Sequence, residues 1–221
     1  MFAWRPLTFL VLLWSCPAAA WGYGYGREDD PVLKAFASAV SAVQGQDLPG
    51  ARKALESVRW QVDELKQAQD LGVDLGPRLA AAHADGATPA QTLEAWANLL
   101  YLGMLQKLHW NLEDGLADYH TCRARLESAI AYYETALAGN VRKDDLRRRE
   151  RDPKAPSRHA DLVEQFAAAR RSLGSPGLFG AGKRDPDLPA FRDAVRRIVG
   201  HLNAVFPSFV RPGAERPPRG R

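Results

Sequence analysis

The sequence predicts an all-α protein, a bundle of about five to seven antiparallel helices. Three observations support this class. Apolar residues recur at spacings of three and four, capping residues precede these runs, and no sustained alternation of β-branched residues indicates a strand. With 221 residues, 46% hydrophobic and 25% charged, the composition is that of a globular protein with one core.

The start of the chain has the layout of an export signal. Arg5 precedes an apolar run over residues 7–14, and three small alanines follow at residues 18–20. The run is shorter than the about 20 residues that a membrane-spanning helix needs. We therefore expect residues 1–20 to be removed near Ala20, which leaves a periplasmic or secreted protein with no transmembrane helix in the mature chain.

Cys16 suggests an alternative processing of this segment. Residues 13–15 partly match the motif before the lipidated cysteine of bacterial lipoproteins, although Trp14 is bulky for it. Lipidation of Cys16 would anchor the protein to a membrane. In a chain cut after Ala20, Cys122 is the remaining cysteine, so an intramolecular disulfide is excluded.

The first predicted helices form a hairpin. Asp30 and Pro31 are a favourable N-cap and first-turn pair for a helix that ends near Gly45. A tight turn leads into a second helix with an apolar seam over residues 51–65, antiparallel to the first. A short third helix is expected over residues 77–84.

The longest helical stretch is predicted over residues 89–138, where the chain contains no proline. Thr88 and Gln91 form a capping-box pair at its start. A single straight helix of about 50 residues would measure about 75 Å, so we expect a break or bend around residues 113–115. The glycine and asparagine at residues 139–140 are typical of a helix end.

Two loops and two helices are predicted in the second half. A charged loop is expected over residues 140–157, because prolines within it prevent helix continuation. Ser157 is a suitable cap for the next helix. A glycine-rich loop over residues 174–187 separates it from the last helix, over residues 188–205. Residues 30–207 would thus form a single helical-bundle domain.

Both ends of the mature chain are predicted to lie outside the bundle. Residues 21–29 are glycine-rich and should form a flexible arm, and residues 208–221 a disordered basic tail. Residues 142–158 and 211–221 together carry more positive charge than the whole chain, whose net charge is +4. Weak contacts with anionic surfaces are expected there. Nucleic acid is not an expected partner of an exported protein.

A metal site is the first candidate for chemistry. His109, Glu113 and His120 are spaced by four and seven, which places them on one side of a continuous helix. Two imidazoles and a carboxylate could bind a transition metal, or a histidine could ligate haem. His109 also shares the register of the apolar seam, as a core histidine would. No Glu-x-x-His, His-Glu-x-x-His or Cys-x-x-Cys-His motif supports the metal.

Enzymatic motifs are weak or missing. Gly-x-Ser-x-Gly does not occur, and residues 177–184 match the spacing of a Walker A loop only as far as Lys183, because Arg184 replaces the magnesium-binding hydroxyl. We expect a non-enzymatic exported bundle without a cofactor, which binds a partner protein or organises a complex in the cell envelope. The alternative is a periplasmic metal- or haem-binding bundle.

Overall fold

The structure, a computed structural model, describes residues 29–67, 71–177 and 181–212. The predicted signal over residues 1–20, with Cys16, lies outside these ranges. Within them the protein is all-α, as predicted: the described residues form no strand, and Ser175 and Arg184 form an isolated β-bridge. None of the described helices is long and apolar enough to cross a membrane.

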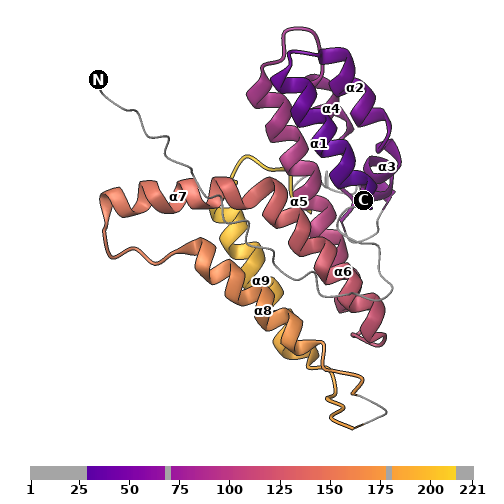
Figure 1. Ribbon diagram of the computed structural model, residues 1–221, viewed down its shortest axis with the longest axis vertical. Helices are drawn as coiled ribbons and strands as arrows, with labels where there is room; N and C mark the ends of the chain where they lie inside the picture. The colour runs from indigo at the N-terminus through magenta and orange to yellow at the C-terminus, as the bar shows by residue number, and fades with distance from the viewer. Residues whose placement is uncertain (1–28, 68–70, 178–180, 213–221) are drawn as a thin grey trace, which may run out of the picture.

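A long, buried helix, α5 (Pro89–Glu113), runs through the molecule (Figure 1). Its N-terminus carries the predicted capping box between Thr88 and Gln91. Four shorter helices lie on the same side of the molecule as α5: α1 (Pro31–Gln44), α2 (Leu48–Glu56), α3 (Arg59–Gln67) and α4 (Gly76–Ala82). Because α5 is covered on several sides, its buried residues are not restricted to one stripe.

The helix predicted over residues 51–65 is instead two helices, α2 and α3. At the break, the Ser57 hydroxyl donates a hydrogen bond to the Ala54 carbonyl at 2.6 Å, and the Val58 amide bonds the Leu55 carbonyl at 3.1 Å. This tight turn redirects the chain while Val58 stays fully buried. The apolar spacing was compatible with both arrangements.

The predicted break near residues 113–115 is confirmed. After α5 ends at Glu113, Gly115 and Leu116 both adopt positive φ, at 60° and 61°, and the chain reverses. The next helix, α6 (Tyr119–Tyr132), begins at Asp118, whose carboxylate accepts the Thr121 amide. The left-handed conformation of Leu116 is strained for a leucine, and the burial of its side chain offsets this cost.

The helix end predicted at residues 139–140 and the charged loop over residues 140–157 are wrong. From α6 the chain continues through a π-helical segment, η1 (Tyr133–Leu137), into α7 (Ala138–Arg151). Gly139 takes helical geometry, and the arginines, lysine and leucine that follow it are good helix formers. Only residues 152–157, which contain the two prolines, form the loop.

The last two helices, α8 (Arg158–Ser172) and α9 (Leu188–Val205), are those predicted, and they form a hairpin across the predicted glycine-rich loop. Ser157 caps α8, as expected, and Asp187 caps α9. In the loop, Gly174 has φ +74°, and a Cβ there would lie 2.3 Å from the Arg184 carbonyl oxygen. Glycine is therefore required at this crossing of the loop.

Residues 208–212, predicted to begin the disordered tail, pack against the bundle. Phe209 is buried, and the Val210 amide donates to Asn98 Oδ1 on α5 at 2.9 Å. Arg78 Nη1 donates to the Ser208 carbonyl at 2.6 Å. The domain therefore extends past Pro207, because an apolar ring and paired main-chain groups attach this segment to α5.

Candidate functional site

The three predicted metal ligands are divided between two helices. His109 and Glu113 lie one turn apart on α5, with His109 Nε2 at 3.3 Å from Glu113 Oε1. His120 is exposed in the first turn of α6, beyond the reversal, with its ring edge-on to Tyr119. In the part of the chain that the structure describes, no three His, Cys, Asp or Glu side chains are placed to hold a metal ion. The continuous helix on which that hypothesis depended is interrupted.

Cys122 is a buried thiol. Burial raises its pKa, which disfavours the reactive thiolate at neutral pH. The Asn111 amide donates to its carbonyl at 2.8 Å and joins α5 to α6. Cys122 therefore has a structural role in the contact between α5 and α6.

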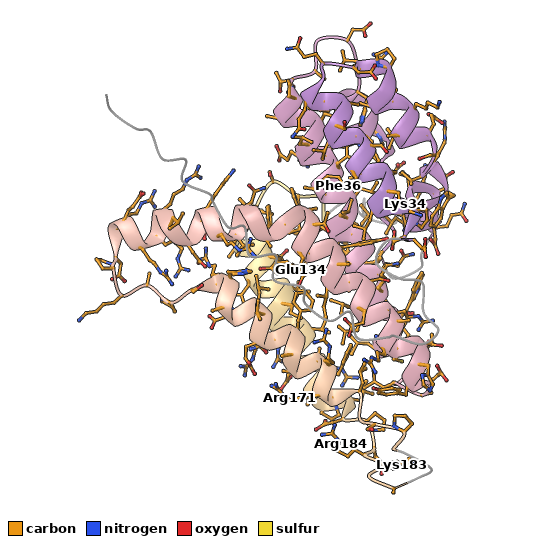
Figure 2. The ribbon with its side chains drawn as sticks, viewed as in Figure 1. Lys34, Phe36, Glu134, Arg171, Lys183 and Arg184 are labelled. Atoms are coloured by element: carbon orange, nitrogen blue, oxygen red, sulfur yellow. The ribbon has the colours of Figure 1, made fainter. Side chains whose placement is uncertain are left out.

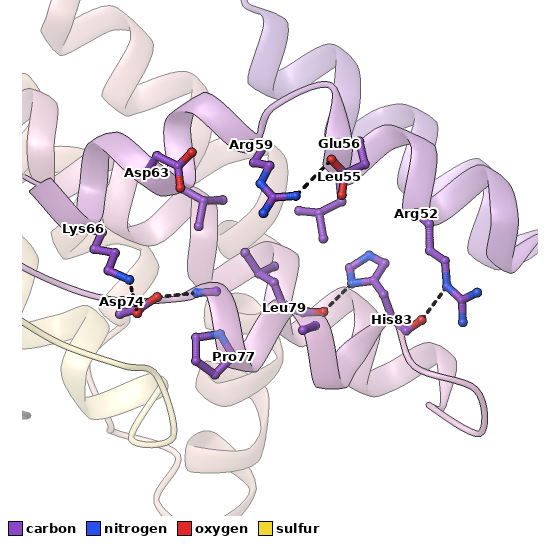
Figure 3. A pocket seen from close by; sticks show the side chains of 13 residues that line it. Arg52, Leu55, Glu56, Arg59, Asp63, Lys66, Asp74, Pro77, Leu79 and His83 are labelled. Atoms are coloured by element: carbon purple, nitrogen blue, oxygen red, sulfur yellow. Dashed lines mark hydrogen bonds and ion pairs between the residues drawn. The ribbon is translucent and has the colours of Figure 1, made fainter.

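A cavity of about 530 Å³ lies between α2, α3 and α4 (Figure 3). Most charged side chains around it are paired, namely Lys66 with Asp74, Arg52 with Asp85 and Arg59 with Glu56. The hydrogen bond between Lys66 and Asp74 raises the pKa of the lysine and lowers that of the carboxyl. Each of these six side chains thus already has a counter-ion.

His83 forms part of the wall of the same cavity. Its Nδ1 lies 2.8 Å from the Leu79 carbonyl, and Trp96 Nε1 donates to its Nε2 at 3.1 Å. A carbonyl only accepts, so Nδ1 carries the proton and Nε2 is the acceptor. Both ring nitrogens are occupied within the fold. This buried histidine connects α4 to α5 and is not available to a ligand.

A second cavity, of about 630 Å³, forms a groove between α1, α5, α7 and residues 205–209. We call it the α7 groove. Its base is apolar and comes from segments far apart in the sequence: Phe36, Val40, Leu93, Phe206 and Phe209. Helices α1, α5 and α7 and the end of α9 thus contribute to one surface. Such a concave apolar base with polar groups at its edge is typical of binding sites.

The acidic side chains at the edge of the α7 groove are already neutralised. Glu94 Oε1 accepts hydrogen bonds from Arg78 Nη2 at 2.9 Å and from Ser208 Oγ at 2.7 Å. Asp144 forms an ion pair with Arg158 at the start of α8. These carboxylates therefore add little negative charge to the groove.

The basic side chains at the same edge are not neutralised by acidic partners among the described residues. Lys143 and Arg147 lie one turn apart on α7, both exposed and both lining the groove. Within residues 29–67, 71–177 and 181–212 neither forms an ion pair. The edge of the groove is therefore positive.

Helix α7 projects away from the bundle, and residues 152–157 return the chain to α8 (Figure 1). Figure 2 shows the side chains of α7 spreading on both sides of this helix. Glu150 and the 62%-exposed Leu146 interrupt an otherwise basic surface. Its exposed cations whose side chains have neither an ion pair nor a hydrogen bond in the described residues are Lys143, Arg147, Arg149 and Arg151 on α7 and Lys154 in the loop that follows.

The base of α7 is attached to α8 through Asp145, which is only 5% exposed. Its carboxylate accepts the Ser157 hydroxyl at 2.8 Å and the amides of Arg158 and His159 at 2.9 and 3.0 Å. Burial opposes ionisation, but the amides of His159 and Arg158 outweigh it, so the pKa of Asp145 is lowered. A carboxylate thus occupies the positive end of the α8 dipole.

A second polar contact joins the π-helical segment to α8. Tyr133 Oη lies 2.7 Å from His159 Nδ1, and Arg142 Nε donates to His159 Nε2 at 3.2 Å. Because an arginine N–H always donates, Nε2 accepts and Nδ1 carries the proton. Burial and the Arg142 charge lower the pKa of His159, and burial raises that of Tyr133. We call Tyr133, Arg142, Asp145 and His159 the α7 clasp.

Comparison of the chain with protein-family models, with curated proteins and with solved structures gives no match. The candidate site therefore depends on the geometry of the α7 groove, the basic helix and the α7 clasp. Sequence reasoning missed the groove, because its base residues come from segments far apart in the sequence. The helix-forming composition of residues 141–151 was the available signal for α7.

Proposed function

We propose that this chain is an exported, non-enzymatic helical-bundle protein that binds an acidic protein partner in the cell envelope through α7. The observation that carries the proposal is a group of five exposed cations, unpaired among the described residues, of which four lie on a helix that projects from the bundle and Lys154 in the loop after it. Its location follows from the signal-like layout of residues 1–20, which stays a prediction. A basic surface of this kind accelerates encounter with an acidic partner and selects against a basic one.

The α7 clasp favours this role for the helix. A binding element whose base is held by buried hydrogen bonds loses less conformational entropy when a partner docks. Asp145 supplies three such bonds to α8. Helix α7 therefore presents its charges in a fixed arrangement.

The composition of α7 favours a protein over a lipid surface. A helix that lies in a membrane interface needs a continuous apolar face opposite its charged one. On α7 the apolar residues Val141 and Ala138 are buried in the bundle, and Leu146 is the single large exposed one. With one exposed leucine among charges, α7 has no such face.

Site-specific photo-crosslinking in the source cells tests the proposal. A photoreactive residue replaces Arg149 on α7 or, as a matched exposed control, Trp60 on α3. We expect one protein, identified by mass spectrometry, to be crosslinked from position 149 but not from position 60. R147E/R151E should abolish that product. Equal products from both positions, or crosslinks to lipid alone, would contradict the proposal.

A further inference from the structure

We infer that the α7 groove binds an acidic amphipathic helix of the partner, with its apolar side on the groove base and its carboxylates against Lys143 and Arg147. The inference rests on the proposed function and names the kind of segment that binds. Three properties of the groove lead to it: the size and polarity of the base, the uncompensated charge of the edge, and the spacing of the two cations.

The groove base has the size and chemistry of a site for apolar side chains. Its volume of about 630 Å³ lies within the range of about 300–1,000 Å³ that is usual for binding pockets. Phe36 and Phe209 are buried below it, whereas Val40 and Leu93 are partly exposed into it. Covering such partly exposed apolar groups is favourable for any occupant with a complementary apolar side.

The charge of the edge selects an acidic occupant. Glu94 and Asp144 are engaged by arginines, whereas Lys143 and Arg147 have no acidic partner in the described residues. A basic occupant would place like charges together as water is excluded, which is costly. The chain's own tail is basic, with four arginines and one glutamate over residues 211–221, so it is a poor occupant of this groove.

The spacing of the cations favours a helix over an extended strand. Lys143 and Arg147 are one turn apart on α7, which separates their Cα atoms by about 6 Å along the helix axis. Carboxylates at positions i and i+4 of a second helix have the same separation. On a neighbouring face of that helix, apolar residues with the spacing j, j+3, j+4 and j+7 would face the base, as in other helix-in-groove complexes.

Fluorescence anisotropy with a designed peptide tests the inference on the purified full-length mature protein. The probe is a labelled amphipathic peptide of about 14 residues, with leucines at i, i+3, i+4 and i+7 and glutamates at its other exposed positions. A second peptide has the same leucines but lysines in place of the glutamates. We expect saturable binding of the acidic peptide in the range of about 10–100 μM, and at least about tenfold weaker binding of the basic one.

Two charge-reversal variants separate the groove from the general basicity of α7. K143E/R147E should weaken binding of the acidic peptide at least about tenfold, whereas R149E/R151E, with the same charge change outside the groove lining, should weaken it less than about threefold. L93S should also weaken binding of the acidic peptide, because it removes an apolar side chain from the groove base. Circular dichroism confirms that each variant is folded.

Several outcomes would overturn the inference. Equal losses in both double variants would assign the binding to overall charge, and equal binding of both peptides would remove charge selection. A dimer at working concentration that K143E/R147E dissociates would assign the groove to a second copy of this chain. Crosslinks from position 149 without peptide binding would refute the groove but not the proposed function, and peptide binding without crosslinks would do the reverse.

Discussion

Arg142 donates its Nε–H to Nε2 of His159 at 3.2 Å, between α7 and the first turn of α8. The contact requires neutral His159, because a protonated ring has no lone pair at Nε2 and would face the guanidinium with a second positive charge. The negative charges of Asp145 on α7 and Glu134 in the π-helical segment raise the pKa of His159. Burial and the Arg142 charge lower it by more, so the pKa of His159 is lowered overall. Glu134 lies where α6 passes into α7 (Figure 2).

The first prediction is a loss of stability in mild acid. The pKa of His159 is lower in the folded protein than its ordinary value of 6.5, so the unfolded chain binds the proton more readily. The contribution of His159 is complete above pH 6.5 and is lost progressively as the pH falls below it. Urea unfolding between pH 7.5 and 5 should show this decline, and H159Q should reduce its slope. An unchanged slope in H159Q would exclude the contact as its source.

The second prediction concerns Asp145. D145A removes a buried carboxylate that accepts three hydrogen bonds at the start of α8, and should lower the free energy of unfolding by about 2–4 kcal/mol. D144A removes a partly exposed ion pair with Arg158 and should cost about 0.5–1 kcal/mol. Denaturant titration compares the two variants. Equal losses would show that the bonds of Asp145 do not hold α7 to α8.

The third prediction tests the packing of α5 against α6. A Cβ at Gly103 would lie 2.8 Å from Cε2 of the Tyr132 ring, and both residues are buried. G103A should therefore destabilise the protein by about 1–3 kcal/mol, because the ring has to shift. Thermal unfolding measures the change. An unaltered melting temperature would mean that the two helices can separate slightly at no cost.

The fourth prediction uses Gly139 as the opposite case. This glycine lies in the first turn of α7, and a Cβ there would meet nothing within 4 Å. G139A should stabilise the protein by about 0.4–1 kcal/mol, since alanine restricts the unfolded chain and suits the helix. Calorimetry beside G103A provides the comparison. Destabilisation by G139A would indicate that α7 bends at this position.

Local signals predicted the helices where caps and side-chain chemistry agree. Asp30 and Ser157 begin helices as expected, and the break after Glu113 follows from the length limit of a helix in a compact domain. The end predicted at residues 139–140 failed for a tertiary reason. The bonds of Asp145 to the amides of α8 stabilise helical structure beyond the glycine, and no local pattern reports a contact between residues 12 to 14 positions apart.

The candidate site was less accessible to sequence reasoning than the fold. Local patterns predicted a helix from Asp30 to near Gly45 and a last helix over residues 188–205, but they contain no information about which helices meet. The same limit affected His109 and His120, since their spacing implies a shared face only along one unbroken helix. The chain reversal between α5 and α6 separates them, and the apparent ligand set with it.

The π-helical segment Tyr133–Leu137 fixes the rotational phase of α7 relative to α6. A π-turn amounts to one additional residue within an α-helix. The wide π-turn absorbs that residue, whereas inserting one further residue into the regular α-helix before it would turn α7 about its axis by about 100° relative to the bundle. Lys143 and Arg147 would then leave the groove, and Asp145 would leave the amides of α8. The direction in which the protein presents its charge is thus set by one residue of helical register.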